Sequence, residues 1–136
     1  MPSYFVPYAA LSIEASRIKD ELMRAIEKVL DGGRYILGPE VGGFESEFAK
    51  YCQTEFACGV DNGTSALFLA LRAMGIQEGD EVITAPNSFV ASASSIVLAG
   101  AKPVFIDIAN DGNIDPQRLE EAITPKTRAI MPVHLT

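Results

Sequence analysis

The stretch that decides the fold is FACGVDNGTSAL, residues 56–67. Its first five residues predict a short buried strand, and the residues after Gly63 predict the first turn of a helix. The first N–H groups of a helix lack intrahelical partners and carry a partial positive charge, so an anion bound there gains hydrogen bonds and favourable electrostatics. Gly63 would let the backbone approach such an anion, and Thr64 and Ser65 would add hydroxyl donors. The same residue types form ordinary turns and helix N-caps, so an anion site and a plain cap are both open.

Beyond this stretch, strands and helices are predicted to alternate. Further strands are expected near residues 81–85, 103–108 and 128–133, and helices near 64–74, 88–99 and after Asp115-Pro116. Strands that alternate with helices pair in parallel through right-handed crossovers, with helices on both faces of the sheet. The sequence therefore predicts an α/β fold with a mostly parallel sheet of four strands.

The region before the deciding stretch is predicted to be helical. Apolar residues recur at helical spacing ahead of a Gly-Gly pair, which predicts an amphipathic helix over about residues 13–31. Pro39 suits the first position of a second helix, whose aromatic residues share one face. Residues 2–10 are expected to form an irregular arm.

Composition and charge narrow the class of partner. The 136 residues, 48% of them hydrophobic, suit one domain, and a net charge of −7 argues against nucleic acid or an acidic membrane surface as partner. No apolar run approaches the roughly 20 residues of a spanning helix, and the N-terminus lacks a signal-peptide pattern, so we expect a cytoplasmic protein. Cys52 and Cys58 show no CxxC spacing and the chain has one histidine, so we expect reduced thiols and no metal site.

Several candidate ligand-binding residues follow predicted strands. Open parallel sheets bind ligands outside the carboxyl ends of their strands. Phe89, expected in the first turn of a helix there, could cover a planar ligand ring or pack in the core. His134 follows the last strand as a pocket residue or a structural histidine, and Tyr8 and Tyr35 lie in loops that could approach a sugar. Each lysine is interpreted as a solvated surface charge and not as the covalent partner of a carbonyl cofactor.

Two long segments resemble a known family. Residues 62–108, NGTSALFLALRAMGIQEGDEVITAPNSFVASASSIVLAGAKPVFIDI, and residues 113–135, NIDPQRLEEAITPKTRAIMPVHL, closely resemble the DegT/DnrJ/StrS sugar aminotransferases. The phosphate turn, the GDEVI strand, the start of the helix after it, the AGAKPVF strand and the PVHL segment occur in the family's order and spacing. The likeness runs from about Phe5 to Leu135.

The resemblance implies the fold of type I pyridoxal phosphate enzymes, which is that of aspartate aminotransferase. Residues 1–136 would supply the N-terminal arm and the first part of the large domain, with the remainder and the small C-terminal domain absent. The implied activity is transfer of an amino group from glutamate to a keto-sugar nucleotide by a homodimer that uses pyridoxal 5′-phosphate. Gly63, Thr64 and Ser65 would hold the cofactor phosphate, and Phe89 would stack on the pyridine ring.

The family's Schiff-base lysine and the aspartate that pairs with the pyridinium nitrogen would both lie beyond Thr136. Because transamination needs both groups, we expect the isolated chain to contain no catalytic residue, to be inactive, and to bind the cofactor weakly if at all. An exposed sheet edge and apolar face would favour self-association. Two alternatives stay open: a sugar dehydratase of the same family, and a non-catalytic anion-binding or assembly module.

Overall fold

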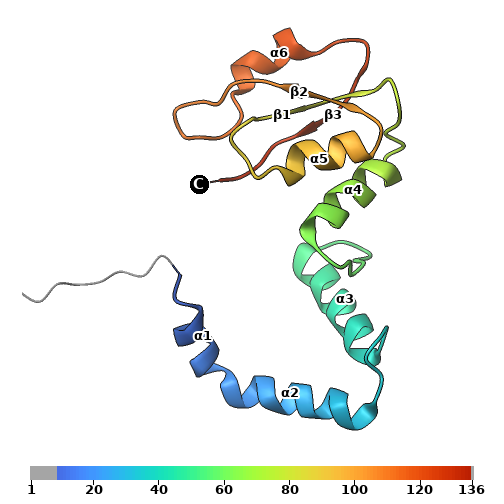
Figure 1. Ribbon diagram of the computed structural model, residues 1–136, viewed down its shortest axis with the longest axis vertical. Helices are drawn as coiled ribbons and strands as arrows, with labels where there is room; N and C mark the ends of the chain where they lie inside the picture. The colour runs from blue at the N-terminus through green and yellow to red at the C-terminus, as the bar shows by residue number, and fades with distance from the viewer. Residues whose placement is uncertain (1–8, 136) are drawn as a thin grey trace, which may run out of the picture. The chain divides into compact units, whose positions relative to one another are not determined.

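The computed structural model describes residues 9–135, which divide into two compact units between Gly59 and Val60. The first unit is helical, and the second combines a three-stranded sheet with helices (Figure 1). The helices of the first unit are α1 (Leu11–Arg17), α2 (Lys19–Gly32) and α3 (Pro39–Cys52).

The helix predicted over residues 13–31 is two helices, because the chain leaves helical geometry at Ile18 (φ −116°, ψ 11°). Near this break the Ser16 hydroxyl donates to the Ile13 carbonyl at 2.7 Å. Such local side-chain bonding competes with the helical pattern and bends helices. The end of α2 is as predicted, since Gly33 adopts a left-handed conformation (φ 63°) that glycine tolerates best. Pro39 stands at the predicted start of α3.

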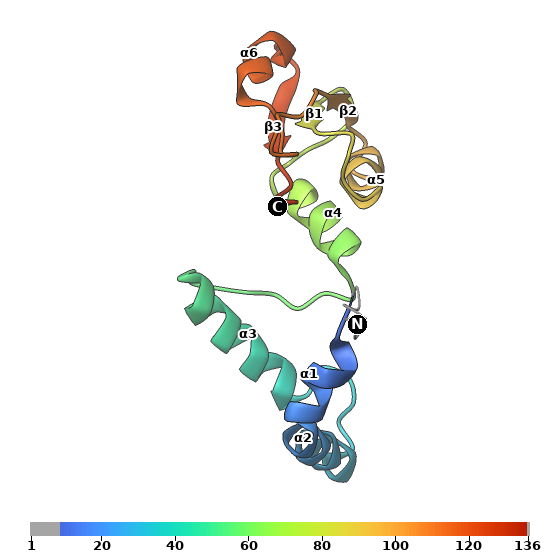
Figure 2. The same cartoon turned by 90° about the vertical axis from the view of Figure 1, so that its left-hand side faces the viewer.

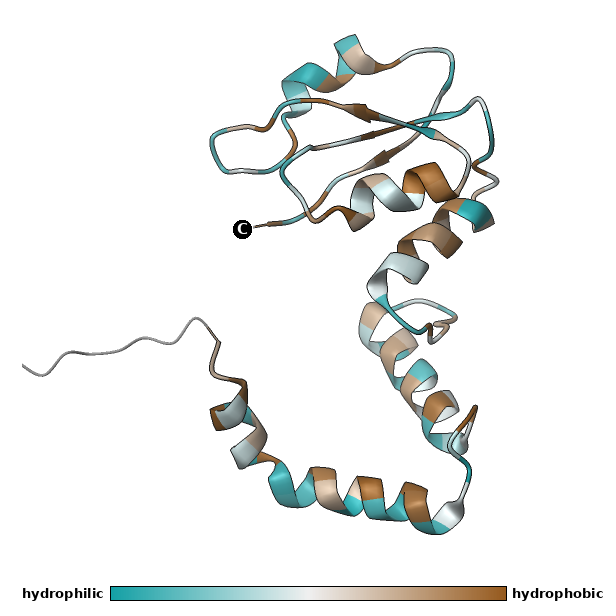
Figure 3. Cartoon of the chain, viewed as in Figure 1, coloured by the Kyte–Doolittle hydropathy of each residue, from teal (hydrophilic) through white to brown (hydrophobic). Residues whose placement is uncertain are grey.

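The helices of the first unit keep most of their apolar side chains exposed. Figure 3 shows hydrophobic positions recurring along α2 and α3, and their exposed fractions reach 59% at Leu30 and 56% at Phe44. Among the residues described in these helices, only Ala49 is buried. Neighbouring aromatic rings on α3 contact one another, with centroids 5.5 Å apart for Phe44 and Phe48. The unit therefore has exposed apolar helix faces but little core of its own.

Residues 56–60 do not form the predicted strand, and that prediction was wrong. The side chain of Phe56 is 79% exposed, and the Gly59 N–H donates to the Glu45 carboxylate at 2.7 Å instead of to a neighbouring strand. A strand needs a hydrogen-bonded neighbour for its backbone groups, and none of residues 9–135 pairs with this segment. The sheet therefore has three strands instead of four.

The second unit is a parallel α/β fold, as predicted. Its strands are β1 (Glu81–Thr84), β2 (Lys102–Phe105) and β3 (Thr127–Met131), and its helices are α4 (Gly63–Ala73), α5 (Ala91–Leu98), the short 3₁₀ helix η1 (Pro116–Arg118) and α6 (Leu119–Ala122). The strand order is β2-β1-β3, all parallel. Because the chain moves from β1 to β2 and then back across to β3, right-handed crossovers place α5 and α6 on opposite faces (Figures 1 and 2).

The core of the second unit lies between the sheet and the α4–α5 pair. It is built from Leu71, Ile76, Val82, Ile96, Ala99 and Ala101. All four residues of β1 are buried because this strand is central. The fully buried Thr84 donates its hydroxyl to the Met131 carbonyl at 2.9 Å, which ties β1 to β3 at their carboxyl ends.

Candidate functional site

The start of α4 combines a helix cap with free backbone donors. Asn62 is extended (φ −162°, ψ 170°), and its side-chain oxygen accepts a hydrogen bond from the Ser65 N–H at 2.9 Å. The N–H groups of Gly63 and Thr64 precede the first intrahelical bond, and they have no acceptor within residues 9–135. The ordinary cap and a possible anion site therefore coexist, because they use different donors.

A cavity of about 610 Å³ opens beside this helix start, at the carboxyl ends of β1 and β3. Small-molecule sites are typically about 300–1,000 Å³. The cavity is lined by Gly63, Thr64 and Leu67 from α4, by Phe89, Ala91 and Ser92 around the start of α5, and by residues 131–135. Its position is where an open parallel sheet is expected to bind a ligand.

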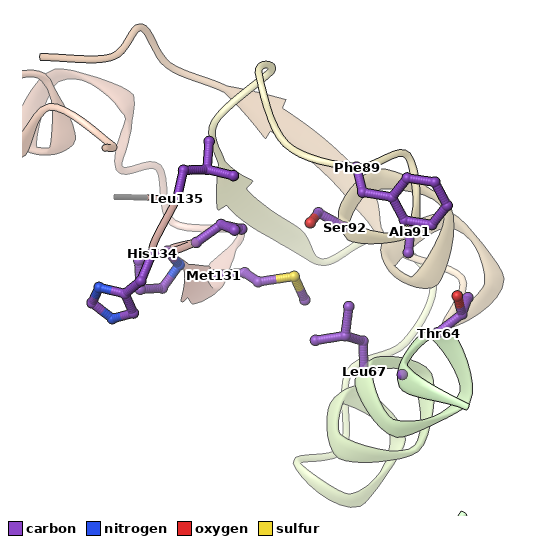
Figure 4. Close-up of a pocket in the computed structure, with 11 residues that line it drawn as sticks. Thr64, Leu67, Phe89, Ala91, Ser92, Met131, His134 and Leu135 are labelled. Carbon is purple, nitrogen blue, oxygen red and sulfur yellow. The ribbon is translucent and has the colours of Figure 1, made fainter. Parts of the chain in front are cut away.

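Four of the predicted site residues line this one cavity: Gly63, Thr64, Phe89 and His134. Figure 4 shows Phe89 and Thr64 together at one end of the cavity and His134 at the other. Phe89 lies in the turn before α5 and not in the first turn of the helix, since α5 begins at Ala91. The Asn87 side chain there donates to the Gly112 carbonyl at 2.8 Å, which holds this segment in a turn.

The other predicted site residues lie outside the lining of this cavity. Ser65 follows Thr64 on α4, and its N–H is engaged by the Asn62 cap. Tyr35 belongs to the first unit, where its hydroxyl donates to the Leu30 carbonyl at 3.4 Å and its side chain is 68% exposed. Tyr8 lies outside the described residues. Their roles stay predictions.

Sequence reasoning missed Ser92, which is 6% exposed, lines the cavity and accepts a hydrogen bond from the Ser88 hydroxyl at 2.8 Å. The available signal was its spacing, because the Ser92 N–H donates to the Phe89 carbonyl at 3.1 Å, so that a residue three positions after Phe89 lies one turn away. It also missed Met131, the last residue of β3.

A cluster of charged side chains lies at the opposite end of the sheet. Lys102 begins β2, Lys126 directly precedes β3, and both line a separate cavity of about 240 Å³ with Glu81. The Thr124 hydroxyl donates to the Glu81 carboxylate at 2.6 Å, which lowers the pKa of Glu81; burial opposes this effect, and Lys102 at 3.4 Å supports it. The lysines of the second unit therefore lie at the amino ends of the strands, away from the Gly63–Phe89 cavity.

Within residues 9–135, no group of three or more His, Cys, Asp or Glu side chains is arranged to hold a metal ion. No helix in that part of the chain combines the length and the apolar character required to cross a membrane.

Comparison with known proteins identifies relatives over almost the whole chain. A 48% identical relative over 131 residues is the dTDP-3-amino-3,4,6-trideoxy-alpha-D-glucose transaminase of Streptomyces venezuelae, with 96% of this chain and 35% of that protein covered. The UDP-2-acetamido-2-deoxy-3-oxo-D-glucuronate aminotransferase of Pseudomonas aeruginosa is 44% identical, with 96% and 36% covered. The chain thus spans about a third of the length of the curated relatives it matches.

Solved structures of aminotransferases of this kind are also similar to the chain over almost its whole length. The crystal structure of S. venezuelae DesV matches with a TM-score of 0.92 and 47% identity, covering 98% of this chain and 36% of that one. NtdA from Bacillus subtilis, with bound cofactor PMP, matches with a TM-score of 0.90 and 32% identity, covering 98% and 32%. The model of the DegT/DnrJ/EryC1/StrS aminotransferase family matches residues 16–136. The chain therefore belongs to the DegT/DnrJ/EryC1/StrS aminotransferase family.

Proposed function

We propose that this chain forms the phosphate-binding and ring-binding part of a pyridoxal 5′-phosphate site. The whole protein would be an aminotransferase that moves an amino group from glutamate to a keto-sugar nucleotide. The observation that carries the proposal is the gathering of Gly63, Thr64 and Phe89 around one cavity in a chain of this family.

The residues at the start of α4 fit a phosphate group. Within residues 9–135 the Gly63 and Thr64 N–H groups, at the start of an 11-residue helix, have no acceptor, and the Thr64 hydroxyl adds a third donor at the cavity wall. A Cβ atom built on Gly63 would meet no atom within 4 Å. Packing within the chain therefore does not require glycine at this position, whereas close approach of an external oxygen to the backbone would favour it. Ser65 would contribute its hydroxyl, since its N–H serves the cap.

The cavity wall beside the start of α4 fits an aromatic ring. Phe89 lines the cavity although 75% of its surface is exposed, so a large apolar face is open to a planar ligand. When bound, pyridoxal phosphate supplies an electron sink to the substrate. The role of Phe89 is to hold the ring in place, while the apolar walls formed by Leu67 and Met131 keep water from it.

The substrate side of the site is part of the same proposal. The relatives above act on dTDP- and UDP-linked sugars by name, which supports a sugar nucleotide as amino acceptor. His134 at the far end of the cavity, together with Tyr8 and Tyr35, would lie on the substrate side. The exposed apolar faces of α2 and α3 support a homodimer, and we assign the protein to the cytoplasm.

We propose that the 136-residue chain alone does not transaminate. Lys102 and Lys126, the lysines of the unit that contains the cavity, lie at the amino ends of the strands and line a different cavity. No amine from that unit lines the Gly63–Phe89 cavity. Since transamination needs a lysine to move a proton between substrate carbon atoms, the second unit supplies binding groups without that base.

Equilibrium dialysis of pyridoxal phosphate against the 136-residue chain tests the proposal. Phe89→Ala is expected to weaken binding roughly two- to tenfold, the value of an aromatic ring contact. Val90→Ala is the matched control, because Val90 is 66% exposed and adjacent but does not line the cavity. Inorganic phosphate should compete with the cofactor. Equal losses in the two variants would contradict the role of Phe89. Binding of phosphate with no preference for pyridoxal phosphate would favour the anion-binding module.

A further inference from the structure

The connection between β2 and η1 contains a tight turn, residues 109–113, that is hydrogen-bonded to the segment before Phe89 and to the segment after His134. The turn is closed by two backbone bonds, from the Ala109 N–H to the Asn113 carbonyl and from the Gly112 N–H to the Ala109 carbonyl, both 2.9 Å. Ile108 and Ile114 form an antiparallel bridge at its base. Gly112 has a φ of 81°, a conformation that other residues rarely adopt. The turn is therefore held in one shape by its own backbone.

Two hydrogen bonds join this turn to the cavity walls. The Asn87 side chain donates to the Gly112 carbonyl at 2.8 Å, and Asn87 is two residues from Phe89. The Leu135 N–H donates to the side-chain oxygen of Asn113 at 3.3 Å, and Leu135 follows His134 directly. The β1–α5 turn and the segment after β3 come from distant parts of the sequence, and the 109–113 turn contacts both.

The orientation of the Asn113 side chain is fixed by Asp111. The Asp111 carboxylate accepts the Asn113 N–H at 3.0 Å and the Asn113 side-chain N–H at 3.2 Å. These bonds lower the pKa of Asp111, with the backbone N–H as the largest cause, so the carboxylate is charged at neutral pH. With its amide nitrogen held by Asp111, Asn113 presents its oxygen to Leu135.

We propose that the 109–113 turn is a brace that sets the spacing between the Phe89 wall and the His134 wall, with Asn87 and Asn113 as positioning residues. Neither asparagine lines the cavity, so both act through the segments that they hold. The identity of the bound ligand rests on the proposed function. The brace itself rests on the two hydrogen bonds that join the turn to Asn87 and Leu135 and on the two that the Asp111 carboxylate accepts.

Amide hydrogen exchange of the 136-residue chain, followed by NMR, tests the brace directly. Asn113→Ala should raise the exchange rate of the Leu135 amide by about fivefold, because a net hydrogen bond of about 1 kcal/mol is lost. The same variant should weaken pyridoxal phosphate binding at least about threefold. Asn110→Ala is the matched control: Asn110 occupies the same turn, is exposed, and makes no side-chain hydrogen bond within residues 9–135.

A rescue variant separates positioning from loss of folding. The double variant D111N/N113D keeps the net charge and keeps one side-chain amide facing one carboxylate. It also leaves an oxygen atom facing the Leu135 N–H. It should restore both exchange protection and affinity. N113D alone places two carboxylates side by side and should not restore them.

Two results would overturn the brace. The first is an exchange rate of the Leu135 amide in Asn113→Ala that stays within twofold of the wild-type rate. The second is a faster exchange rate in Asn113→Ala with unchanged affinity for pyridoxal phosphate. If the wild-type chain does not bind pyridoxal phosphate, the binding role proposed for Gly63, Thr64 and Phe89 in this chain fails. The brace is then decided by the Leu135 exchange rates of Asn113→Ala and of the rescue variant.

Discussion

The two units of this chain differ in how far they bury the apolar side chains of their helices. The second unit buries Leu71 to 1% exposure and Ile96 completely against its sheet. The first unit leaves Leu22, Ile26 and Leu30 of α2 between 43% and 59% exposed, although these residues share the spacing of an amphipathic helix. An apolar stripe thus predicts a helix, but it does not predict that this chain supplies the surface that covers the stripe.

The sheet explains the difference. A helix stripe is buried only when a second layer covers it. In the second unit, parallel pairing makes β1 a fully buried central strand on which α5 packs, and α4 packs on α5. In the first unit, Ala49 is the buried residue among those described in α1 to α3. Stability should therefore be concentrated in the second unit.

The largest expected effect is a cavity in the core of the second unit. Leu71→Ala should lower the free energy of unfolding by about 2–5 kcal/mol, since it removes a fully buried side chain. Urea denaturation followed by circular dichroism measures this change. Leu30→Ala in α2 is the matched substitution and should cost less than about 1 kcal/mol, because its site is 59% exposed. Equal costs would mean that the first unit folds on a core of similar quality, and the comparison would fail.

An intermediate effect is expected at the helix starts. At the start of α4 the Asn62 side chain accepts a hydrogen bond from the Ser65 N–H, whereas the N-caps of α1, α2 and α3 make no side-chain hydrogen bond. Asn62→Ala should destabilise the chain by about 1 kcal/mol. Thermal unfolding measures the loss, with Asn110→Ala as a control that should leave the melting temperature unchanged. An unchanged melting temperature in Asn62→Ala would show that packing alone holds the start of α4.

The smallest expected effect is a pH dependence at the amino ends of the strands. The folded-state pKa of Glu81 lies below the ordinary glutamate value of 4.5, chiefly because Thr124 donates to it. Its contribution to stability is therefore complete above about pH 4.5 and is lost as pH falls through the lower folded-state value. The melting temperature of the wild type should exceed that of Glu81→Gln near neutral pH, and the difference should shrink on acidification below pH 4.5.

Glu40→Gln provides the comparison in the first unit. Glu40 pairs with Lys28 at 3.4 Å, but both side chains are well exposed, at 40% and 76%. Exposed pairs contribute about 0–1 kcal/mol, so this variant should change the melting temperature little at any pH. A Glu81→Gln difference that stayed constant from neutral to acidic pH would exclude titration of Glu81 as its source.

Local signals predicted much of the fold and part of the site. Pro39 marks the start of α3 through its fixed φ, and Gly33 marks the end of α2 because glycine tolerates a positive φ, so both boundaries were predictable. The alternating pattern gave a parallel sheet, and the rule for carboxyl strand ends placed Phe89 and His134 on one side of it. The break at Ile18 was not predicted, because Ile18 itself fits the helical spacing of apolar residues that continues at Leu22.

The sequence by itself determined the order and type of the elements, the donors at the start of α4 and the membership of the family. These follow from short-range stereochemistry and from motif order. The tertiary structure alone decided that residues 56–60 are not a strand, that Ser92 lines the cavity, and that the 109–113 turn contacts both of its walls. Strand pairing and side-chain contacts join residues tens of positions apart, and no local pattern specifies which distant groups will be present to bond.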